Sequence, residues 1–520
     1  MEGKGLIAHG GSIALALLLA LGLAAAPARA ATLVVPNQFA TIQAAVDAAA
    51  DGDRVLVKKG GGGGPNGEYN ENVVIYNKSI TLKCMKGAVI DVSETQTTLD
   101  PDGAGGAFGD VDFSAGITIF DDDGEADGTT VKGCTVKFAK DCTGGSPECP
   151  NNSDSGDGID VSCLQCPGAP HPVDEITIKN CTLIGNESDG LELFLSDHFL
   201  VKGNSAVGND HNGFTIVGSD GVIEKNVARG GGLGFVVFGS SNLIRQNRAL
   251  VNDGAGFEMF VETSTIIRNR AVNNDGDGFL VFGPGNTVAD NVAWGNDGHG
   301  FDIHDPDSVT GNKAVGNDSS GFHIDDVSGA TISRNSATSN STGFLLSAVT
   351  GAGATVERNT AALNKFEGFR CVECKNVSFE KNKATRNGWE GFLHFSGSGS
   401  MYKDNTTKKN SADGIRVRDN GDDTTLDGNK VRKNAGDGID IDSAATGVVI
   451  TNNKVKKNRG TGIENNGVLT DITDNIVEGN RTDIAGTGHD GTGSVGAFTG
   501  NTFSTGGDTT STPGTGPFDP

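Results

Sequence analysis

A motif of Gly followed by Phe, Leu or Ile returns at nearly constant intervals through the central part of the chain. The interval is about 22 residues, which is typical of proteins that stack many copies of one small structural unit. Because each unit is too short to hold a helix beside its strands, the spacing favours a solenoid of short strands. The motif begins at Gly190, Gly213, Gly234, Gly256, Gly278, Gly300, Gly321, Gly343, Gly368, Gly391, Gly414, Gly438 and Gly462.

The residues that follow these glycines alternate between apolar and polar, as in Gly213-Phe-Thr-Ile-Val and Gly300-Phe-Asp-Ile-His. A period of two is typical of a β-strand with one buried face. A strand that recurs once per coil can pair only with its equivalents above and below, which gives parallel sheets with a coil spacing of about 4.8 Å. We therefore predict an all-β fold, a parallel β-helix solenoid.

Asn marks two further positions of the repeat. At a recurring turn, Asn tolerates the left-handed backbone conformation, and its amide can bond the equivalent amide of the next coil, as in the Asn ladders of stacked strands. We expect such ladders here. The first position holds Asn204, Asn226, Asn247, Asn269, Asn291, Asn312, Asn335, Asn359 and Asn382, and more weakly Asn405, Asn429, Asn453 and Asn475. The second holds Asn252, Asn274, Asn296, Asn317, Asn340, Asn364, Asn387, Asn410, Asn434 and Asn458.

Composition agrees with repeated tight turns rather than with an ordinary globular core. Gly accounts for 79 of 520 residues, against about 7% in average proteins, and the chain has only 2 Trp and 3 Tyr. A leucine-rich repeat of similar length is the structural alternative. The chain lacks the L-x-x-L-x-L frame of that repeat and is poor in Leu, so the β-helix is preferred.

The region before the repeats resembles a known family. The stretch from Thr41 to Ala50 is predicted to form an amphipathic helix that caps the open end of the stack, and a strand follows at Arg54-Val-Leu-Val57. The segments Thr41-Ile-Gln-Ala-Ala-Val-Asp-Ala-Ala49, Gly52-Asp53 and Gly67-Glu-Tyr-Asn-Glu-Asn-Val73 are similar to the opening of the pectin-lyase-like superfamily. With the repeats, the resemblance covers roughly residues 33 to 485 and implies a right-handed β-helix.

Four regions are expected along the chain. Residues 1–30 have the features of a signal peptide, because the apolar run from Ile13 to Ala26 is shorter than the ~20 residues of a membrane span and Ala28-Arg29-Ala30 follows it as a cleavage pattern. A membrane anchor is the alternative. Residues 31–98 should hold the cap and first coils, and 99–485 the β-helix with irregular insertions near 99–128 and 142–168. Residues 486–520 are expected to form a flexible tail rich in Gly, Thr and Ser.

The charge of the chain limits its partners. The formal charge is −25, and loss of residues 1–30, which carry Lys4, Arg29 and Glu2, makes it −26. Such an acidic protein is not expected to bind nucleic acid through its overall field. No later apolar run is long enough to cross a bilayer. We expect a secreted or periplasmic monomer without a membrane span in the mature chain.

All 9 cysteines lie after residue 30, where export permits disulfides. Four of them crowd the irregular stretch 142–168, where two disulfides with three open pairings are preferred over a zinc site. Cys371 and Cys374 form either a small local bridge or two unreactive thiols. An odd count leaves at least one thiol unpaired or intermolecular. The crowded cysteines are Cys142, Cys149, Cys163 and Cys166.

The strand after each repeat glycine defines an outward stripe. Its first and third residues are apolar in nearly every coil and should face inward, so the second and fourth should face solvent. Phe194, Phe238, Phe260 and Phe282 of this stripe would form an exposed aromatic column. Such a patch is a candidate surface for sugar stacking or partner binding. Alternatively, a loop or the C-terminal tail covers it, or the register has slipped.

Beside this column, two adjacent coils place four ionisable side chains together. Asp302 should lie next to His323, and His304 next to Asp325, in a square with sides of about 5 and 7 Å. Each carboxylate would raise the pKa of its neighbouring imidazole and fix its tautomer, so the cluster is a candidate general base. The same side chains could hold a divalent metal. Solvated polar residues without a task are the third interpretation.

The segment Asp302-Ile-His-Asp305 resembles the D-P-H-D motif of mannuronan C5-epimerases, β-helix enzymes that act on uronate polymers. The resemblance implies that His304 abstracts the proton next to the sugar carboxylate and that Asp302 supports it. Ile303 replaces the Pro of the motif, and no Tyr is near to act as the acid. The closest outward Arg, Arg370, lies three coils from His304, so a bound Ca²⁺ could be required to neutralise the substrate carboxylate. No other cofactor is indicated.

A second polar patch lies further along the stripe. Asp440 and Asp442 follow Arg416 and Arg418 in the next coil, an arrangement that would suit acid/base work on galacturonans. Two Asp on one strand are weak evidence for such work. We therefore favour mutual salt bridges at this patch.

Three functions fit these features. The first is an enzyme, a lyase or C5-epimerase of an acidic polysaccharide, with the Asp302, His304, His323 and Asp325 cluster as its catalytic residues and Arg370 and the Phe column as substrate contacts. The second is a non-catalytic surface or adhesion protein that binds a glycan or another partner. The third is a periplasmic accessory β-helix protein. Fold alone cannot choose between them, because function lies in the site.

Overall fold

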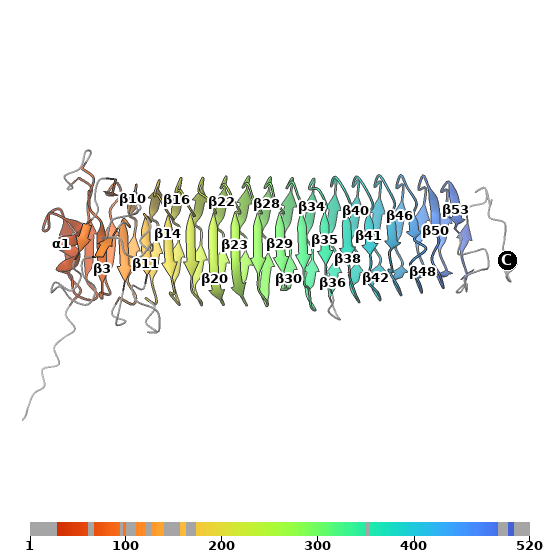
Figure 1. Ribbon diagram of the computed structural model, residues 1–520, viewed down its shortest axis with the longest axis horizontal. Coiled ribbons are helices and arrows are strands. Elements are labelled where there is room, and N and C mark those ends of the chain that lie inside the picture. The colour runs from red at the N-terminus through yellow and green to blue at the C-terminus, as the bar shows by residue number, and fades with distance from the viewer. Residues whose placement is uncertain are drawn as a thin grey trace, which may run out of the picture.

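The computed structural model is a long solenoid in which short strands stack along one axis from the N-terminal to the C-terminal end (Figure 1). It describes residues 29–60, 67–93, 97–99, 111–113, 115–120, 126–139, 156–162, 173–349, 354–486 and 498–503. A typical coil contributes one strand to each of three parallel sheets, here named A, B and C in chain order. The predicted all-β parallel solenoid is confirmed.

Sheet A consists of β1 (Thr32–Val35), β2 (Arg54–Val57), β4 (Thr81–Cys84), β9 (Thr130–Lys132), β12 (Thr177–Lys179), β15 (Leu200–Lys202), β18 (Val222–Glu224), β21 (Leu243–Arg245), β24 (Thr265–Ile267), β27 (Asn286–Ala289), β30 (Pro306–Thr310), β33 (Thr331–Ser333), β36 (Thr355–Glu357), β39 (Ser378–Glu380), β42 (Met401–Lys403), β45 (Thr425–Asp427), β48 (Val449–Thr451), β51 (Asp471–Thr473) and β54 (Phe498–Thr499).

Sheet B consists of β5 (Val89–Asp91), β10 (Thr135–Lys137), β13 (Thr182–Ile184), β16 (Ser205–Val207), β19 (Val227–Arg229), β22 (Arg248–Leu250), β25 (Arg270–Val272), β28 (Val292–Trp294), β31 (Lys313–Val315), β34 (Ser336–Thr338), β37 (Thr360–Ala362), β40 (Lys383–Thr385), β43 (Thr406–Lys408), β46 (Lys430–Arg432), β49 (Lys454–Lys456), β52 (Ile476–Glu478) and β55 (Thr502–Phe503).

Sheet C consists of β3 (Val73–Tyr76), β8 (Ile117–Phe120), β11 (Ile159–Ser162), β14 (Leu191–Phe194), β17 (Phe214–Val217), β20 (Phe235–Ser240), β23 (Phe257–Glu262), β26 (Phe279–Phe282), β29 (Phe301–His304), β32 (Phe322–Asp325), β35 (Phe344–Ser347), β38 (Phe369–Val372), β41 (Phe392–Phe395), β44 (Ile415–Arg418), β47 (Ile439–Ile441), β50 (Thr461–Asn465) and β53 (Thr482–Ala485).

The core is a narrow apolar column enclosed by the three sheets. The residue after most repeat glycines is an inward Phe, and consecutive rings from Phe214 to Phe392 stack with centroids 4.6 to 4.9 Å apart. Phe301, in the middle of this stack, is fully buried. Steric crowding requires a glycine before Phe301, because a Cβ at Gly300 would lie 2.6 Å from the carbonyl oxygen of Gly321 in the next coil. The Gly-Phe motif therefore fixes both the turn and the core.

Two ladders of buried Asn hold successive coils together, as predicted. In the first ladder, which lies where sheet A turns into sheet B, the backbone N–H of Asn291 donates to Asn312 Oδ1 at 2.9 Å. In the second, at the turn from sheet B to sheet C, Asn317 donates to Asn340 Oδ1 in the same way at 2.9 Å. These bonds satisfy turn groups that would otherwise be buried without partners. Register is thus fixed by the turns as well as by the core.

The N-terminal region contains one short helix, α1 (Ile42–Asp47). Thr41 caps it, and the Glu71 carboxylate accepts the backbone N–H groups of Ile42 at 2.8 Å and Gln43 at 3.0 Å. The helix ends three residues before the predicted Ala50, with Ala48 as its C-cap, and the chain then turns through Gly52 (φ +81°) to enter β2. Its role as a cap stays a prediction. No helix in the described ranges is both long and apolar enough to cross a membrane.

Several predictions concern residues outside the described ranges: most of the signal peptide, most of the C-terminal tail and the four cysteines between 142 and 166. Within the two expected insertions, β8 and β11 pair with each other in sheet C. In the first insertion, β7 (Val111–Phe113) pairs antiparallel with β6 (Thr97–Leu99), whose last residue begins the insertion. Among the described cysteines, Cys371 and Cys374 form the local bridge. Cys84 and Cys134, which the sequence did not single out, form another disulfide between neighbouring coils, and Cys181 is a buried free thiol.

Candidate acid/base site on sheet C

The outer surface of sheet C carries the candidate site. In β29, Phe301 and Ile303 are fully buried, whereas Asp302 and His304 are partly exposed, so the predicted register is correct here. The inward positions are otherwise apolar near this site, but in β41 further along the solenoid the third residue, His394, is polar and fully buried. Its Nδ1 lies 3.1 Å from the Tyr402 hydroxyl, and burial lowers its pKa. His394 therefore belongs to the core and not to the outer surface.

The aromatic column is shorter than predicted. Phe238, Phe260 and Phe282 stack at 5.0 and 5.1 Å, and the imidazole of His304 continues the stack at 4.4 Å from Phe282. Val217 lies between Phe194 and Phe238 in the register, so Phe194 stands apart. Each ring in the stack covers the face of its neighbour, so the column offers ring edges to solvent. Sugars stack on ring faces, and the column is therefore an apolar strip rather than a set of stacking platforms.

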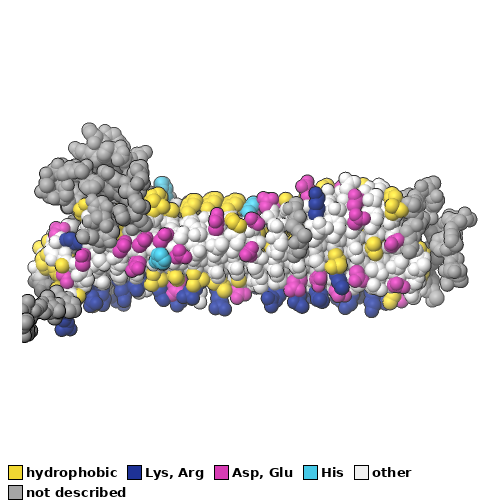
Figure 2. Space-filling view, turned by 90° about the horizontal axis from the view of Figure 1, so that it is seen from below, with side chains coloured by type: hydrophobic (Ala, Val, Ile, Leu, Met, Phe, Trp, Pro, Cys, Tyr) yellow, Lys and Arg dark blue, Asp and Glu magenta, His cyan; other side chains and the backbone are white. Residues whose placement is uncertain are grey.

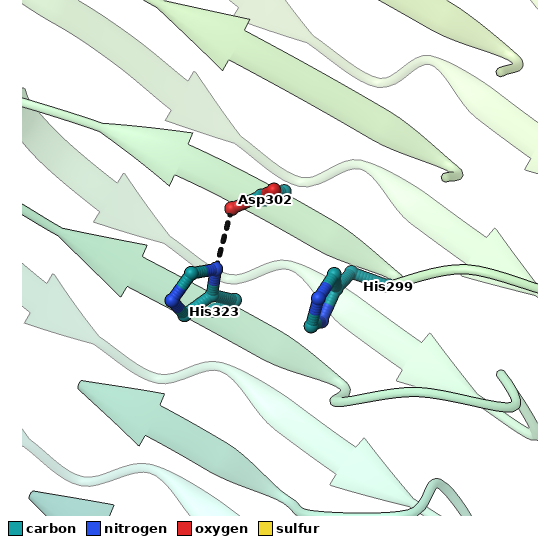
Figure 3. A group of neighbouring side chains, drawn as sticks. All are labelled: His299, Asp302 and His323. Atoms are coloured by element: carbon teal, nitrogen blue, oxygen red, sulfur yellow. Dashed lines mark hydrogen bonds and ion pairs between the residues drawn. The ribbon is translucent and has the colours of Figure 1, made fainter. Parts of the chain in front are cut away.

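Asp302 and His323 form the closest pair of the cluster. They are partners in the β29–β32 register, and His323 Nδ1 lies 2.7 Å from Asp302 Oδ1 (Figure 3). An ionised carboxylate can only accept, so Nδ1 carries the proton and Nε2 holds the free electron pair of the neutral ring. Nε2 lies 3.2 Å from Ser347 Oγ. The side chains are 21% and 16% exposed for His323 and Asp302, which leaves the pair within reach of a ligand.

Hydrogen bonding and charge act in the same direction on this pair. The bond to Asp302 raises the pKa of His323 above its ordinary value, against an opposing effect of burial. Burial alone would raise the pKa of Asp302, but the bond and the charge of His323 outweigh it and the pKa is lowered. The carboxylate therefore stays ionised and orients the imidazole.

His299 is a third member of the site that the sequence did not reveal. It lies one residue before Gly300, and its ring stacks on that of His323 at 5.0 Å (Figure 3). The backbone N–H of Ser320 donates to His299 Nδ1 at 3.3 Å, and burial lowers the pKa of the ring. His299 is thus a neutral side chain whose Nδ1 electron pair is engaged. The residue before each repeat glycine could have been searched for site residues, because the side chains at this position of the repeat also point toward the outer surface of sheet C.

The other half of the predicted square is looser. His304 Nε2 lies 3.4 Å from Asp302 Oδ1, and His304 pairs with Asp325 in the register. The ligand atoms of His304, Asp325 and Asp326 lie within 4.8 Å of one another. Asp302 thus bonds His323 more closely than His304, which differs from the roles that the epimerase-like motif implied.

Arg370 is the nearest outward cation of sheet C to this pair among the described residues. It lies two coils beyond His323, with Leu345 between them in the register. Its guanidinium is 3.8 Å from the buried Glu367 carboxylate. Arg370 is therefore about two strand spacings, or about 10 Å, from His323 along the axis, and its guanidinium faces Glu367.

Two groups of carboxylates bear on the expectation of Ca²⁺, which prefers oxygen ligands. Asp157, Asp160 and Glu192 bring their oxygens within 4.8 Å of one another, and this set fits the ion. The set of Asp413, Asp437 and Asp440 fits less well, because the Arg416 guanidinium already pairs with Asp440 at 3.2 Å and approaches Asp413 at 3.8 Å. Of the salt bridges predicted for the second polar patch, the pair of Arg416 and Asp440 is present, whereas Arg418 pairs with its neighbour Asp419 instead of with Asp442. The group of His299, Asp302 and His323 is rich in nitrogen and is a poor Ca²⁺ site.

The Asp302→Asn variant is expected to lower the pKa of His323. It removes the charge that favours the imidazolium and leaves the burial that disfavours it. Because the folded-state pKa of His323 is raised and that of Asp302 lowered, the pair stabilises the fold most between their ordinary values of 6.5 and 3.8, and less on either side. NMR titration of the His323 ring in both proteins measures the shift. An unchanged His323 titration would contradict the pairing.

Comparison with known families identifies the class of the fold. The right-handed β-helix region family matches the chain in overlapping segments at residues 113–261, 171–318, 229–361, 305–431 and 353–505. These matches cover well over half of the chain, and the protein belongs to the right-handed β-helix family. The expected handedness is thereby confirmed. A comparison with curated proteins finds no match.

Several solved β-helix structures are similar. They include the periplasmic alginate epimerase AlgG, at 14% identity over 76% of each chain with a TM-score of 0.31. The A-module of the Azotobacter vinelandii mannuronan C-5 epimerase AlgE6 has 17% identity over 89% of this chain and 94% of its own, with a TM-score of 0.23. A mannuronic acid specific polysaccharide family 6 lyase from human gut microbiota has 12% identity over 73% and 87%, with a TM-score of 0.37. Sequence identities and TM-scores this low carry no information about the chemistry of the site.

Proposed function

We propose that the protein binds an acidic polysaccharide along the outer surface of sheet C and modifies it with the Asp302–His323 pair. The observation that carries the proposal is the 2.7 Å bond from His323 Nδ1 to Asp302, which turns Nε2 into an oriented base on a partly exposed surface. His299 is less suited to this role, because burial lowers its pKa and the hydrogen-bond partners of its ring are Ser319 and Ser320 instead of a carboxylate. Phe194, Phe238, Phe260, Phe282 and Arg370 are the proposed substrate contacts.

The proposed reaction is proton abstraction from C5 of a uronate unit. His323 Nε2 takes the C5 proton, and the electron pair spreads into the adjacent carboxylate. Return of a proton to the opposite face inverts C5, which is epimerisation. Alternatively, the bond from C4 to its glycosidic oxygen breaks, a C4–C5 double bond forms and the leaving oxygen takes a proton, which is lyase chemistry. His304 and Asp325 lie beside the pair and are proposed to hold or relay that second proton.

Binding without turnover is the second candidate, and one observation favours it. Stabilisation of the charge that develops on the carboxylate needs a cation, and Arg370 lies two coils from His323. On a polymer laid along the solenoid axis, Arg370 would contact a neighbouring unit instead. A Ca²⁺ ion held beside the pair by the carboxylates of Asp325 and Asp326 would supply that charge, and chelation would then abolish turnover but leave the fold intact.

Turnover of a panel of uronate polymers tests the proposal. The His323→Gln variant is expected to lower kcat/KM by about 10²- to 10⁴-fold, because the base is lost, while polymer affinity stays near that of the unmodified protein. His211→Gln, an exposed His elsewhere on the solenoid, is the matched control and should keep full activity. Activity that survives His323→Gln would exclude the pair as the site. Polymer binding with no turnover of any uronate polymer would favour the second candidate.

We further propose that the protein is exported as a monomer, with residues 1–30 as its signal peptide. A polysaccharide substrate lies outside the cytoplasm, and the disulfides Cys84–Cys134 and Cys371–Cys374 agree with an oxidising compartment. N-terminal sequencing of the exported protein should begin at Ala31. A cytoplasmic protein that keeps Met1 would exclude export.

A further inference from the structure

Lys and Arg gather along one long edge of the solenoid, although the chain as a whole is strongly acidic (Figure 2). Near the C-terminal end, sheet B and the turn after it concentrate these cations in three columns parallel to the axis, here called the basic ladder. The first column holds Lys383, Lys430 and Lys454, the second Lys408, Arg432 and Lys456, and the third Arg386, Lys409, Lys433 and Lys457.

The register places like charges directly opposite one another in this ladder. Lys408 pairs with Arg432, and Arg432 with Lys456, across β43, β46 and β49, while Lys430 pairs with Lys454 beside them. Adjacent strands are about 4.8 Å apart, so each cation faces another at close range. The repulsion is visible at Lys408, whose pKa is lowered, chiefly by Arg432. Nothing in the packing requires these residues, because they point away from the core and most are exposed.

The third column carries an additional backbone cost. Arg386, Lys409, Lys433 and Lys457 all have positive φ, between 58° and 61°. Equivalent turns in other coils use Gly295 and Gly316, for which this conformation carries no penalty, but also Val251 and Leu363 at φ 54° and 58°. The four basic residues therefore carry the backbone cost of any non-Gly residue in this turn, and the electrostatic repulsion adds to it.

Acidic partners within the ladder are scarce. In its last coil, Lys456 pairs with Glu478 at 2.9 Å. Sheet B of earlier coils also carries exposed Arg229, Arg248 and Arg270, and Arg248 faces Arg270 in the register. The turn after the sheet differs there, because Gly230, Val251 and Asn273 stand in place of the cations of the third column. The basic ladder is thus a local concentration of positive charge. Over the Debye length of about 8 to 10 Å at physiological salt, its own field outweighs the negative charge of distant coils.

We propose that the basic ladder is a second binding surface, which holds a linear anionic polysaccharide along the solenoid axis. The cations point outward in parallel rows and do not converge on one point, so they suit a polymer with an anionic group on successive units rather than a single small anion. Binding would relieve the repulsion between rows and release counterions from the polymer. The three columns contain Lys, Arg and Thr but no aromatic side chain, which disfavours single-stranded nucleic acid, since its bases bind on aromatic platforms.

This surface is separate from the acid/base site. The ladder lies on sheet B between β40 and β49, whereas Asp302 and His323 belong to sheet C, several coils nearer the N-terminus. A polymer held on sheet B would keep the protein on its substrate while sheet C acts on another segment or chain. The inference does not require that the proposed chemistry is correct, because charge alone carries it.

Binding to immobilised polygalacturonate and dextran sulfate, with neutral dextran as the blank, tests the proposal. The triple variant Lys408→Gln, Arg432→Gln, Lys433→Gln is expected to weaken binding of the anionic polymers by about 10- to 100-fold, from three charge contacts of up to about 1 kcal/mol each. Binding of the unmodified protein should fall steeply with added salt. The thermal midpoint of the triple variant should be unchanged or higher, since repulsion is removed.

The matched control is the triple variant Arg229→Gln, Arg248→Gln, Arg270→Gln. It changes the net charge by the same amount on the same sheet. Binding should survive in this control and in His323→Gln, which separates the ladder from the proposed acid/base site. Equal losses in the two triple variants would show that only net charge matters and would overturn the proposal. Tighter binding of duplex DNA or of vesicles with anionic lipid than of either polysaccharide would overturn the choice of ligand.

Discussion

The Asn312→Asp variant is expected to destabilise the coils around it by about 3 to 5 kcal/mol, although the side chain hardly changes in shape. Asn312 is 1% exposed, and its Nδ2 donates to the Val288 carbonyl at 2.8 Å and to Asn335 Oδ1 at 3.1 Å. A carboxylate has no hydrogen to donate, so two buried acceptors would lose their partner and face a negative charge. The loss should be large because Asn312 and its ladder neighbours Asn291 and Asn335 are at most 1% exposed.

Hydrogen exchange of the amides in the surrounding coils measures this effect best, because each coil of a solenoid contacts only its neighbours and global unfolding is not a single transition. Asn273→Asp is the matched control, since Asn273 is exposed beside the second ladder and tolerates the same change in water. A small, equal effect of the two variants would mean that the ladder does not hold the coils together.

The Phe301→Ala variant should cost a similar amount, about 3 to 5 kcal/mol, through a different cause. The Phe301 ring is fully buried and stacks between Phe279 at 4.9 Å and Phe322 at 4.8 Å. Its removal leaves a cavity in a core only one side chain deep, and the neighbouring rings are held in place by their own coils. The cavity therefore cannot close easily.

Denaturation by urea, followed together with local hydrogen exchange, gives the loss for Phe301→Ala. Phe260→Ala removes a ring of the same size from the outer column, where the side chain is 38% exposed and stacks at similar distances. The outer variant should lose much less stability. If both variants lost the same amount, ring stacking rather than burial would stabilise the solenoid.

The fold could be predicted from the sequence because the same local choices recur in every coil. Gly300, Phe301 and Asn312 each occupy a position whose equivalents carry the same residue, or in the case of Phe301 another large apolar one, for the same steric or hydrogen-bonding reason. Repetition turns a weak local signal into a strong one. Places where the pattern lapses were correspondingly harder to predict: the length of α1 and the Cys84–Cys134 disulfide depend on contacts that occur once.

For the candidate site, the sequence could predict only which residues lie opposite one another in the strand register. Period-two alternation places Asp302 opposite His323, and the structure does the same. Rotamers decide which imidazole the carboxylate bonds, and here it bonds His323 more closely than His304. His299 escaped notice because it lies in the turn before the strand, where alternation no longer says which way a side chain points.

The most direct test of the proposed chemistry is deuterium exchange at C5 of a bound uronate polymer in D₂O. Incubation with the unmodified protein should place deuterium at C5 of inverted units, or yield chains with a C4–C5 double bond at the new end, and His323→Gln should abolish both products. A polymer that binds to the protein and yet shows neither deuterium at C5 nor unsaturated ends would contradict an acid/base role for Asp302 and His323.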